Sequence, residues 1–136
     1  MKGSPEGKPG SATVETHHRL QLALLEALEQ ILRQGRDRAL ADGTLARFLD
    51  FSRIHFQAEE ALMALADYPE TGAHASAHRR FLAEALEIQR AATAAGAPQA
   101  LAAVSGLDKA LRDHISGFDE DFERWSAARS ASSPGR

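Results

Sequence analysis

The stretch VETHHRLQLALLEAL, residues 14–28, joins two adjacent histidines to a run of leucines with helical spacing. Apolar residues recur every three or four positions and charged residues lie opposite them: Leu20, Leu24, Leu25, Leu28, Ile31 and Leu32 against Glu15, Arg19, Glu26 and Arg33. The pattern predicts an amphipathic helix over residues 14–34. Histidines at the start of a buried face need an explanation, because an ionisable side chain is costly to bury without a partner.

Three further segments have the same helical periodicity. Helix breakers at RQGRD (33–37), ADGT (41–44), DYPETG (67–72) and AAGAP (94–98) separate them from one another. We therefore predict helices over residues 44–67, 71–94 and 98–126, the last beginning at Pro98, a residue suited to a first helical turn. No alternating strand pattern competes with these helices. Four amphipathic helices with short connections predict an all-α fold, an antiparallel up-down-up-down four-helix bundle.

The length of 136 residues fits a single domain. Residues 1–13 are dominated by Gly, Pro, Ser and Lys, and residues 127–136, AARSASSPGR, have no periodicity. We expect a disordered N-terminal arm over 1–13, the bundle over 14–126 and a disordered C-terminal tail over 127–136.

The composition limits the compartments and the classes of binding partner that we expect. No apolar run approaches the roughly 20 residues of a membrane span, the first residues lack the apolar core of a secretory signal, and there is no cysteine. A cytoplasmic location without membrane association is the expectation. The net charge of −3 comes without a basic stripe, which argues against nucleic acid. The expected partner is a small molecule.

Two predicted helices carry ionisable pairs at a spacing of one turn. His55 and Glu59 in HFQAEE are four residues apart, as are His74 and His78 in HASAH. Residues four apart project from the same helix face, so each pair points to a common position. Each pair also falls on the inner face of its helix. Glu60, next to Glu59, lies about 100° off that face, and we expect it to be solvated.

The last predicted helix carries a third pair with a different spacing. His114 and Asp119 in HISGFD are five residues apart, about 140° around an ideal α-helix. This pair alone would be weak evidence for a shared site. An aspartate at the edge of the inner face could still reach toward a second ion.

Together with one histidine from residues 14–34, the inner faces supply five imidazoles and two carboxylates. A single core histidine is usually a hydrogen-bonded structural residue, but here five of six histidines lie on inner faces. Seven ligands exceed the four of a structural zinc site, whereas two ions bridged by carboxylates would use all seven. Imidazoles with bridging oxygen ligands suit iron, and ligand type also admits manganese, zinc or cobalt.

The ordered motifs H…HFxxEE…HxxxH…HIxxxD over residues 14–126 resemble the hemerythrin family, including the bacterial hemerythrin-like (HHE cation-binding) domains. The resemblance implies a non-haem di-iron centre with a bridging oxo or hydroxo group. It implies three sets of ligands: His74, His78 and His114 on one iron, His55 and a histidine of residues 14–34 on the other, and Glu59 and Asp119 bridging both. The second iron would keep one open position, where family members bind dioxygen reversibly as a hydroperoxide.

Two arguments about the ligand from the first helix disagree. On a helical wheel, His17 lies nearer the centre of the apolar face, whereas the family-like register HRLQLALLEAL fits His18. We predict His18. The residue three positions later lines the dioxygen pocket in family members, so His18 brings Gln21 into the pocket where His17 would bring Leu20.

The resemblance also implies the rest of the oxygen pocket. Phe56 and Ile115, each one residue after a ligand, match an apolar lining, and Leu111 is expected to join them. Ala110 stands where many family members carry tryptophan. With Gln21, it predicts a roomier or more polar pocket than is usual.

These features predict a protein that binds dioxygen reversibly as a carrier, store or sensor. No catalytic acid or base is predicted, because every inward ionisable side chain is already used as a ligand. One alternative is a di-iron oxidoreductase that handles peroxide or nitric oxide, for which a looser pocket would be suitable. Another is an iron or redox sensor that acts through an unidentified protein partner.

Overall fold

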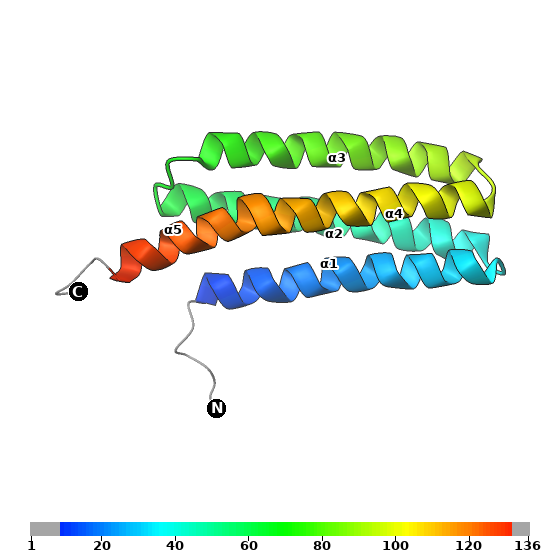
Figure 1. The fold of residues 1–136 in the computed structure, drawn as a ribbon, viewed down its shortest axis with the longest axis horizontal. Helices are drawn as coiled ribbons and strands as arrows, with labels where there is room; N and C mark the ends of the chain where they lie inside the picture. Colours follow the sequence, from blue (N-terminus) through cyan, green and yellow to red (C-terminus); the bar gives the residue numbers. More distant parts are fainter. Residues whose placement is uncertain (1–8, 132–136) are drawn as a thin grey trace, which may run out of the picture.

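The computed structural model describes residues 9–131, with side chains described for residues 14–130. Three helices precede a longer fourth one: α1 Pro9–Gln34, α2 Arg38–Leu65, α3 Thr71–Ala94, and then α4 Ala97–His114, η1 Ile115–Asp119 and α5 Glu120–Ala131 in unbroken succession. Helix α1 packs on α2 and α4, and α3 packs on the same two helices. Neighbouring helices run in opposite directions (Figure 1). The predicted antiparallel four-helix bundle is confirmed.

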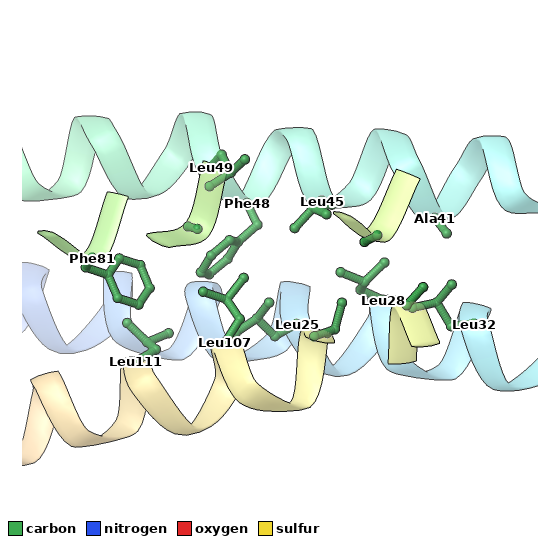
Figure 2. Close-up of a cluster of buried hydrophobic side chains, with 14 of the residues drawn as sticks. Leu25, Leu28, Leu32, Ala41, Leu45, Phe48, Leu49, Phe81, Leu107 and Leu111 are labelled. Carbon is green, nitrogen blue, oxygen red and sulfur yellow. The ribbon is translucent and has the colours of Figure 1, made fainter. Parts of the chain in front are cut away.

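The apolar faces of all four helices meet in one core. The cluster is shown in Figure 2, and among its fully buried members are Leu25, Phe48, Leu107 and Leu111. Burial of each such side chain contributes about 1.5–3 kcal/mol. This core occupies the half of the bundle next to the α1–α2 and α3–α4 turns.

A second, smaller apolar cluster lies nearer the opposite end. Met63, Tyr68 and Phe122 are its buried members, and Trp125 packs against them. On α2, and on the long helix formed by α4, η1 and α5, the ionisable residues of the inner face lie between residues of these two clusters. Apolar packing above and below therefore limits the access of water to the polar layer.

The predicted start of the second helix is wrong. Helix α2 begins at Arg38 and runs through Gly43, where the sequence predicts a break. The Asp37 side chain accepts a hydrogen bond from the Leu40 backbone N–H at 2.9 Å and so caps the helix six residues earlier than predicted. A glycine in a helix costs only about 1 kcal/mol, which burial of Ala41 and Thr44 on either side offsets.

The bundle also extends past both predicted boundaries. Helix α1 starts at Pro9 instead of residue 14, and α5 continues to Ala131 instead of residue 126. Proline is tolerated in a first helical turn, and the Arg129 guanidinium lies 5.0 Å from the centre of the Trp125 ring one turn earlier. The other residues of the predicted disordered ends, 1–8 and 132–136, lie outside the described residues. Within the described part of the chain, no helix has the length and apolar character that crossing a bilayer requires.

Candidate metal centre

The structure brings together the seven residues that the sequence predicts as metal ligands. They form two overlapping groups in which one possible ligand atom per residue lies within 4.8 Å of every other: Glu59, His74, His78, His114 and Asp119 in the first, and His18, His55, Glu59 and Asp119 in the second. All four long helices of the bundle contribute residues to these groups. We call these the three-histidine group and the two-histidine group.

Short contacts join the side chains of the three-histidine group. His78 Nε2 lies 3.0 Å from Glu59 Oε1, and His74 Nε2 lies 2.8 Å from Asp119 Oδ1. His114 Nε2 lies 3.1 Å from the same Asp119 oxygen. Each of these five side chains is at least nine-tenths buried. The imidazoles of α3 and α4 thus converge on one oxygen from each carboxylate.

Asp119 faces both groups with different oxygens. Its Oδ1 is the atom next to His74 and His114, whereas its Oδ2 lies 2.8 Å from His18 Nε2. Glu59 belongs to both groups as well, with Oε1 next to His78 and Oε2 without a hydrogen-bond partner. Two carboxylates between two sets of imidazoles have the arrangement of bridging ligands.

A π-helical turn explains how Asp119 reaches this position. The prediction of a 140° offset from His114 assumed an ideal α-helix, and that assumption is wrong here. Residues Ile115–Asp119 form a π-helix, in which the Glu120 backbone N–H bonds to the carbonyl oxygen of Ile115, five residues earlier. A π-turn winds more widely than an α-helix, so residues five apart lie closer to one face than the roughly 140° offset of an ideal α-helix. The Asp119 carboxylate therefore stacks on the same face as His114.

Several buried atoms of the two groups make no hydrogen bond of acceptable geometry. Four of these atoms belong to the two-histidine group and two more to the three-histidine group: His18 Nε2, His55 Nε2, Glu59 Oε2 and Asp119 Oδ2, then His74 Nδ1 and His114 Nε2. Unsatisfied buried polar atoms cost about 1–3 kcal/mol each. Their convergence on common positions fits metal coordination, and nitrogen and carboxylate donors suit iron, manganese, zinc or cobalt.

The carboxylates of the centre are held in the ionised form. Burial opposes ionisation of Asp119, but the close contacts with His114, His18 and His74 outweigh it and keep the pKa of the carboxyl far below its usual range. Burial likewise opposes ionisation of Glu59, and hydrogen bonds from His74 and His78 lower its pKa. Both side chains are therefore available as anionic ligands at neutral pH.

The imidazoles differ in protonation. Burial lowers the pKa of His55 to about 4, so its ring is neutral at pH 7 and has a lone pair available on one ring nitrogen. Burial acts in the same direction on His74, but hydrogen bonds with Asp119 and Glu59 raise its pKa to about 9. His18 also has a raised pKa, because its contact with Asp119 outweighs burial. At pH 7 the protonated His74 ring therefore offsets part of the negative charge of the two carboxylates.

The two adjacent histidines of α1 occupy different places. His18 is 9% exposed and belongs to the two-histidine group. His17 belongs to neither group. Its Nδ1 lies 2.9 Å from Nδ1 of His55, and its ring packs edge-on against Phe51. His17 thus contacts the nitrogen of His55 that faces away from the centre.

Glu60 is a neighbour of the centre that the sequence analysis missed. Its side chain is only 35% exposed, instead of solvated as expected, and its Oε2 accepts a hydrogen bond from His78 Nδ1 at 2.7 Å. A metal-binding histidine usually donates its other ring N–H to such an acceptor. The sequence signal that could have identified Glu60 was an acidic residue next to a predicted ligand, because each metal-binding histidine needs an acceptor for its second ring N–H.

The residues predicted for the oxygen pocket differ in burial. Gln21, Phe56 and Leu111 are buried, and the Phe56 ring stacks on His78 with 4.0 Å between ring centres. Ile115 is partly buried and packs against the apolar core.

Ala110 instead lines a surface groove of about 240 Å³ between α3 and α4. Ala77, Phe81, His114 and Phe118 are among the other residues of the groove. The small side chain at 110 therefore leaves space on the side of the three-histidine group.

The chain is similar to a known protein family and to several known proteins. The family described as the hemerythrin HHE cation binding domain matches residues 10–125. A bacteriohemerythrin of Ralstonia nicotianae is 27% identical over 122 residues, which cover 88% of this chain and 84% of the relative. Hemerythrin-like proteins of Naegleria gruberi and Naegleria fowleri are each 27% identical over 114 residues, 84% of this chain and 83% of theirs. No solved structure gives a significant match. The resemblance read from the motifs is confirmed, and the chain belongs to the hemerythrin family.

Proposed function

We propose that the two groups bind two iron ions with a bridging oxo or hydroxo group. His74, His78 and His114 would hold one ion, His18 and His55 the other, and Glu59 and Asp119 both. The observation that carries this proposal is the position of Asp119, whose two oxygens face different groups. The unsatisfied buried atoms and membership in a cation-binding family support it further.

We further propose that the protein binds dioxygen reversibly as a carrier, store or sensor. The two-histidine group offers one imidazole fewer than the other group, so an ion held there would have one protein ligand fewer and could accept a small ligand. Two bound iron ions supply the electrons that dioxygen takes up on binding. The chain's part is to hold and shield them: Phe56 and Leu111 exclude water, and His17 and Glu60 orient the rings of His55 and His78.

A reversible-oxygenation spectrum tests this function. Iron-loaded protein, reduced without oxygen, is expected to take up dioxygen with a new visible absorption band and to lose that band when oxygen is removed. One-way oxidation coupled to turnover of hydrogen peroxide would contradict it and favour the alternative of a di-iron oxidoreductase for peroxide or nitric oxide. The buried amide of Gln21 is the observation that favours this second candidate. A cytoplasmic location, sensing and an unidentified protein partner stay predictions from the sequence.

Replacement of Glu60 by alanine is expected to lower the affinity for iron about 10–100-fold, because His78 loses the acceptor that orients its ring. Competition with a chelator measures the affinity. Glu60→Gln should recover much of it, because the amide oxygen can still accept from Nδ1. Asp50→Ala on the same helix removes an exposed carboxylate that contacts Arg53 and serves as the control. Equal affinity of Glu60→Ala and wild type would exclude an orienting role.

A further inference from the structure

A buried polar pair lies inside the bundle between α1 and α2. Gln21 Nε2 donates a hydrogen bond to Ser52 Oγ at 2.8 Å, and both side chains are 0% exposed. The next residues along the inner faces are apolar, among them Leu25 on α1 and Phe48 on α2. Neither residue is one of the seven predicted metal ligands.

This pair lies one helical turn from the two-histidine group. Gln21 follows His18 by three residues, and Ser52 precedes His55 by three residues. Three residues rise about 4.5 Å along a helix, and the two helices are antiparallel, so both steps lead in the same direction, toward the apolar core. Gln21 and Ser52 therefore form a polar wall on the core side of His18 and His55.

One end of the Gln21 amide has no partner. Oε1 is buried without a hydrogen bond, while Nε2 bonds to Ser52. A 180° rotation of the amide keeps its shape and lets the Ser52 hydroxyl donate to Oε1, which frees Nε2 as a donor. In either orientation Ser52 holds the amide in place and leaves one polar end free. A buried polar end without a partner is unfavourable unless a ligand satisfies it.

We propose that Gln21, oriented by Ser52, is a specificity residue that donates a hydrogen bond to a small anion bound at the two-histidine group. This inference rests on the proposed iron centre and names the ligand class that its open position favours. With the amide rotated so that Ser52 donates to Oε1, an anion with an acceptor atom satisfies Nε2, whereas a leucine at this position could offer only apolar contact. A small anion is thus bound more tightly than it would be in an apolar pocket.

Azide titration of the oxidised, iron-loaded protein tests the proposal. Gln21→Leu and Gln21→Met, two apolar replacements of similar size, are expected to weaken azide binding about tenfold or more, because a hydrogen bond to a charged group is lost. Ser52→Ala should give a smaller loss, because it only releases the amide. The stretching frequency of bound azide should shift in the Gln21 variants, which a purely structural role would not cause.

Thr44→Val is the matched control. Thr44 is also buried on α2, but its hydroxyl donates to the Leu40 carbonyl oxygen, two turns farther from His55 than Ser52. Its azide affinity should equal that of wild type. Metal-free Gln21→Leu should melt no lower than wild type, since it removes an unsatisfied polar atom.

Two outcomes separate this inference from the proposed function. Wild-type azide affinity and an unshifted stretch in both Gln21 variants, with two iron ions per chain, would overturn the inference alone. Fewer than two iron ions in wild type would overturn both.

Discussion

Asp119→Ala is expected to reduce the iron content from two ions to fewer than one per chain. Asp119 is shared by both groups, and its oxygens lie 2.8 Å from His18 and His74 and 3.1 Å from His114. Its loss would remove a carboxylate ligand that both ions share, and with it the contact that raises the pKa values of His74 and His18. Iron per chain is measured after reconstitution and gel filtration.

Two further variants make this result specific. Asp119→Asn keeps the shape but removes the negative charge, and should also hold fewer than two ions even if alanine disturbs folding. Asp113→Ala removes an exposed carboxylate from the same long helix, where it contacts Lys109, and should keep both ions. Two ions in both Asp119 variants would show that this carboxylate does not bridge.

The bundle and the i,i+4 pairs were predictable because they depend on ordinary helix geometry. Residues four apart on an α-helix share a face whatever surrounds them, so His55 with Glu59 and His74 with His78 needed no tertiary information. The apolar periodicity located α3 to the residue, from Thr71 to Ala94. Family membership followed from the order of these pairs along the chain.

Other features depend on local departures from ideal helices. The π-turn at Ile115–Asp119 changes the angle between His114 and Asp119. No residue type in this segment predicts an i to i+5 hydrogen bond. The early start of α2 depends on the Asp37 cap and on burial around Gly43, which outweigh the helix-breaking tendency of glycine. A sequence pattern assigns glycine its average tendency to break a helix, whereas the packing around a particular glycine decides whether the helix continues through it.

Contacts beyond the ligands were predictable only in part. A helical wheel places Glu60 on the outside, but a long side chain at the edge of a buried face can still reach His78 on the next helix. The polarity of Gln21 was visible in the sequence, while its partner Ser52 was not, because their hydrogen bond joins residues 31 positions apart. The sequence thus predicted which ionisable side chains gather at the centre better than the residues that hydrogen-bond to them.

His18→Ala is expected to lose one of the two iron ions and keep the other. The two-histidine group would retain a single imidazole, His55, whereas the three-histidine group is unchanged. His17→Ala should keep both ions with affinity for the second lowered about tenfold, because only the contact with His55 Nδ1 is removed. Iron analysis of both variants, beside wild type, distinguishes them.

The comparison is informative because the two histidines are neighbours in sequence and differ only in the direction of their rings. The helical wheel of α1 favours His17 as the inward residue, and the reverse result, one ion lost in His17→Ala and none in His18→Ala, would support that register. The structure points the other way: His18 Nε2 lies 2.8 Å from Asp119, while His17 reaches only the outer nitrogen of His55. If His18 is the ligand, Gln21 lies one turn farther along α1, beside the position proposed for the anion. The variants His17→Ala and His18→Ala therefore also test whether the polar wall of Gln21 and Ser52 lies next to that position.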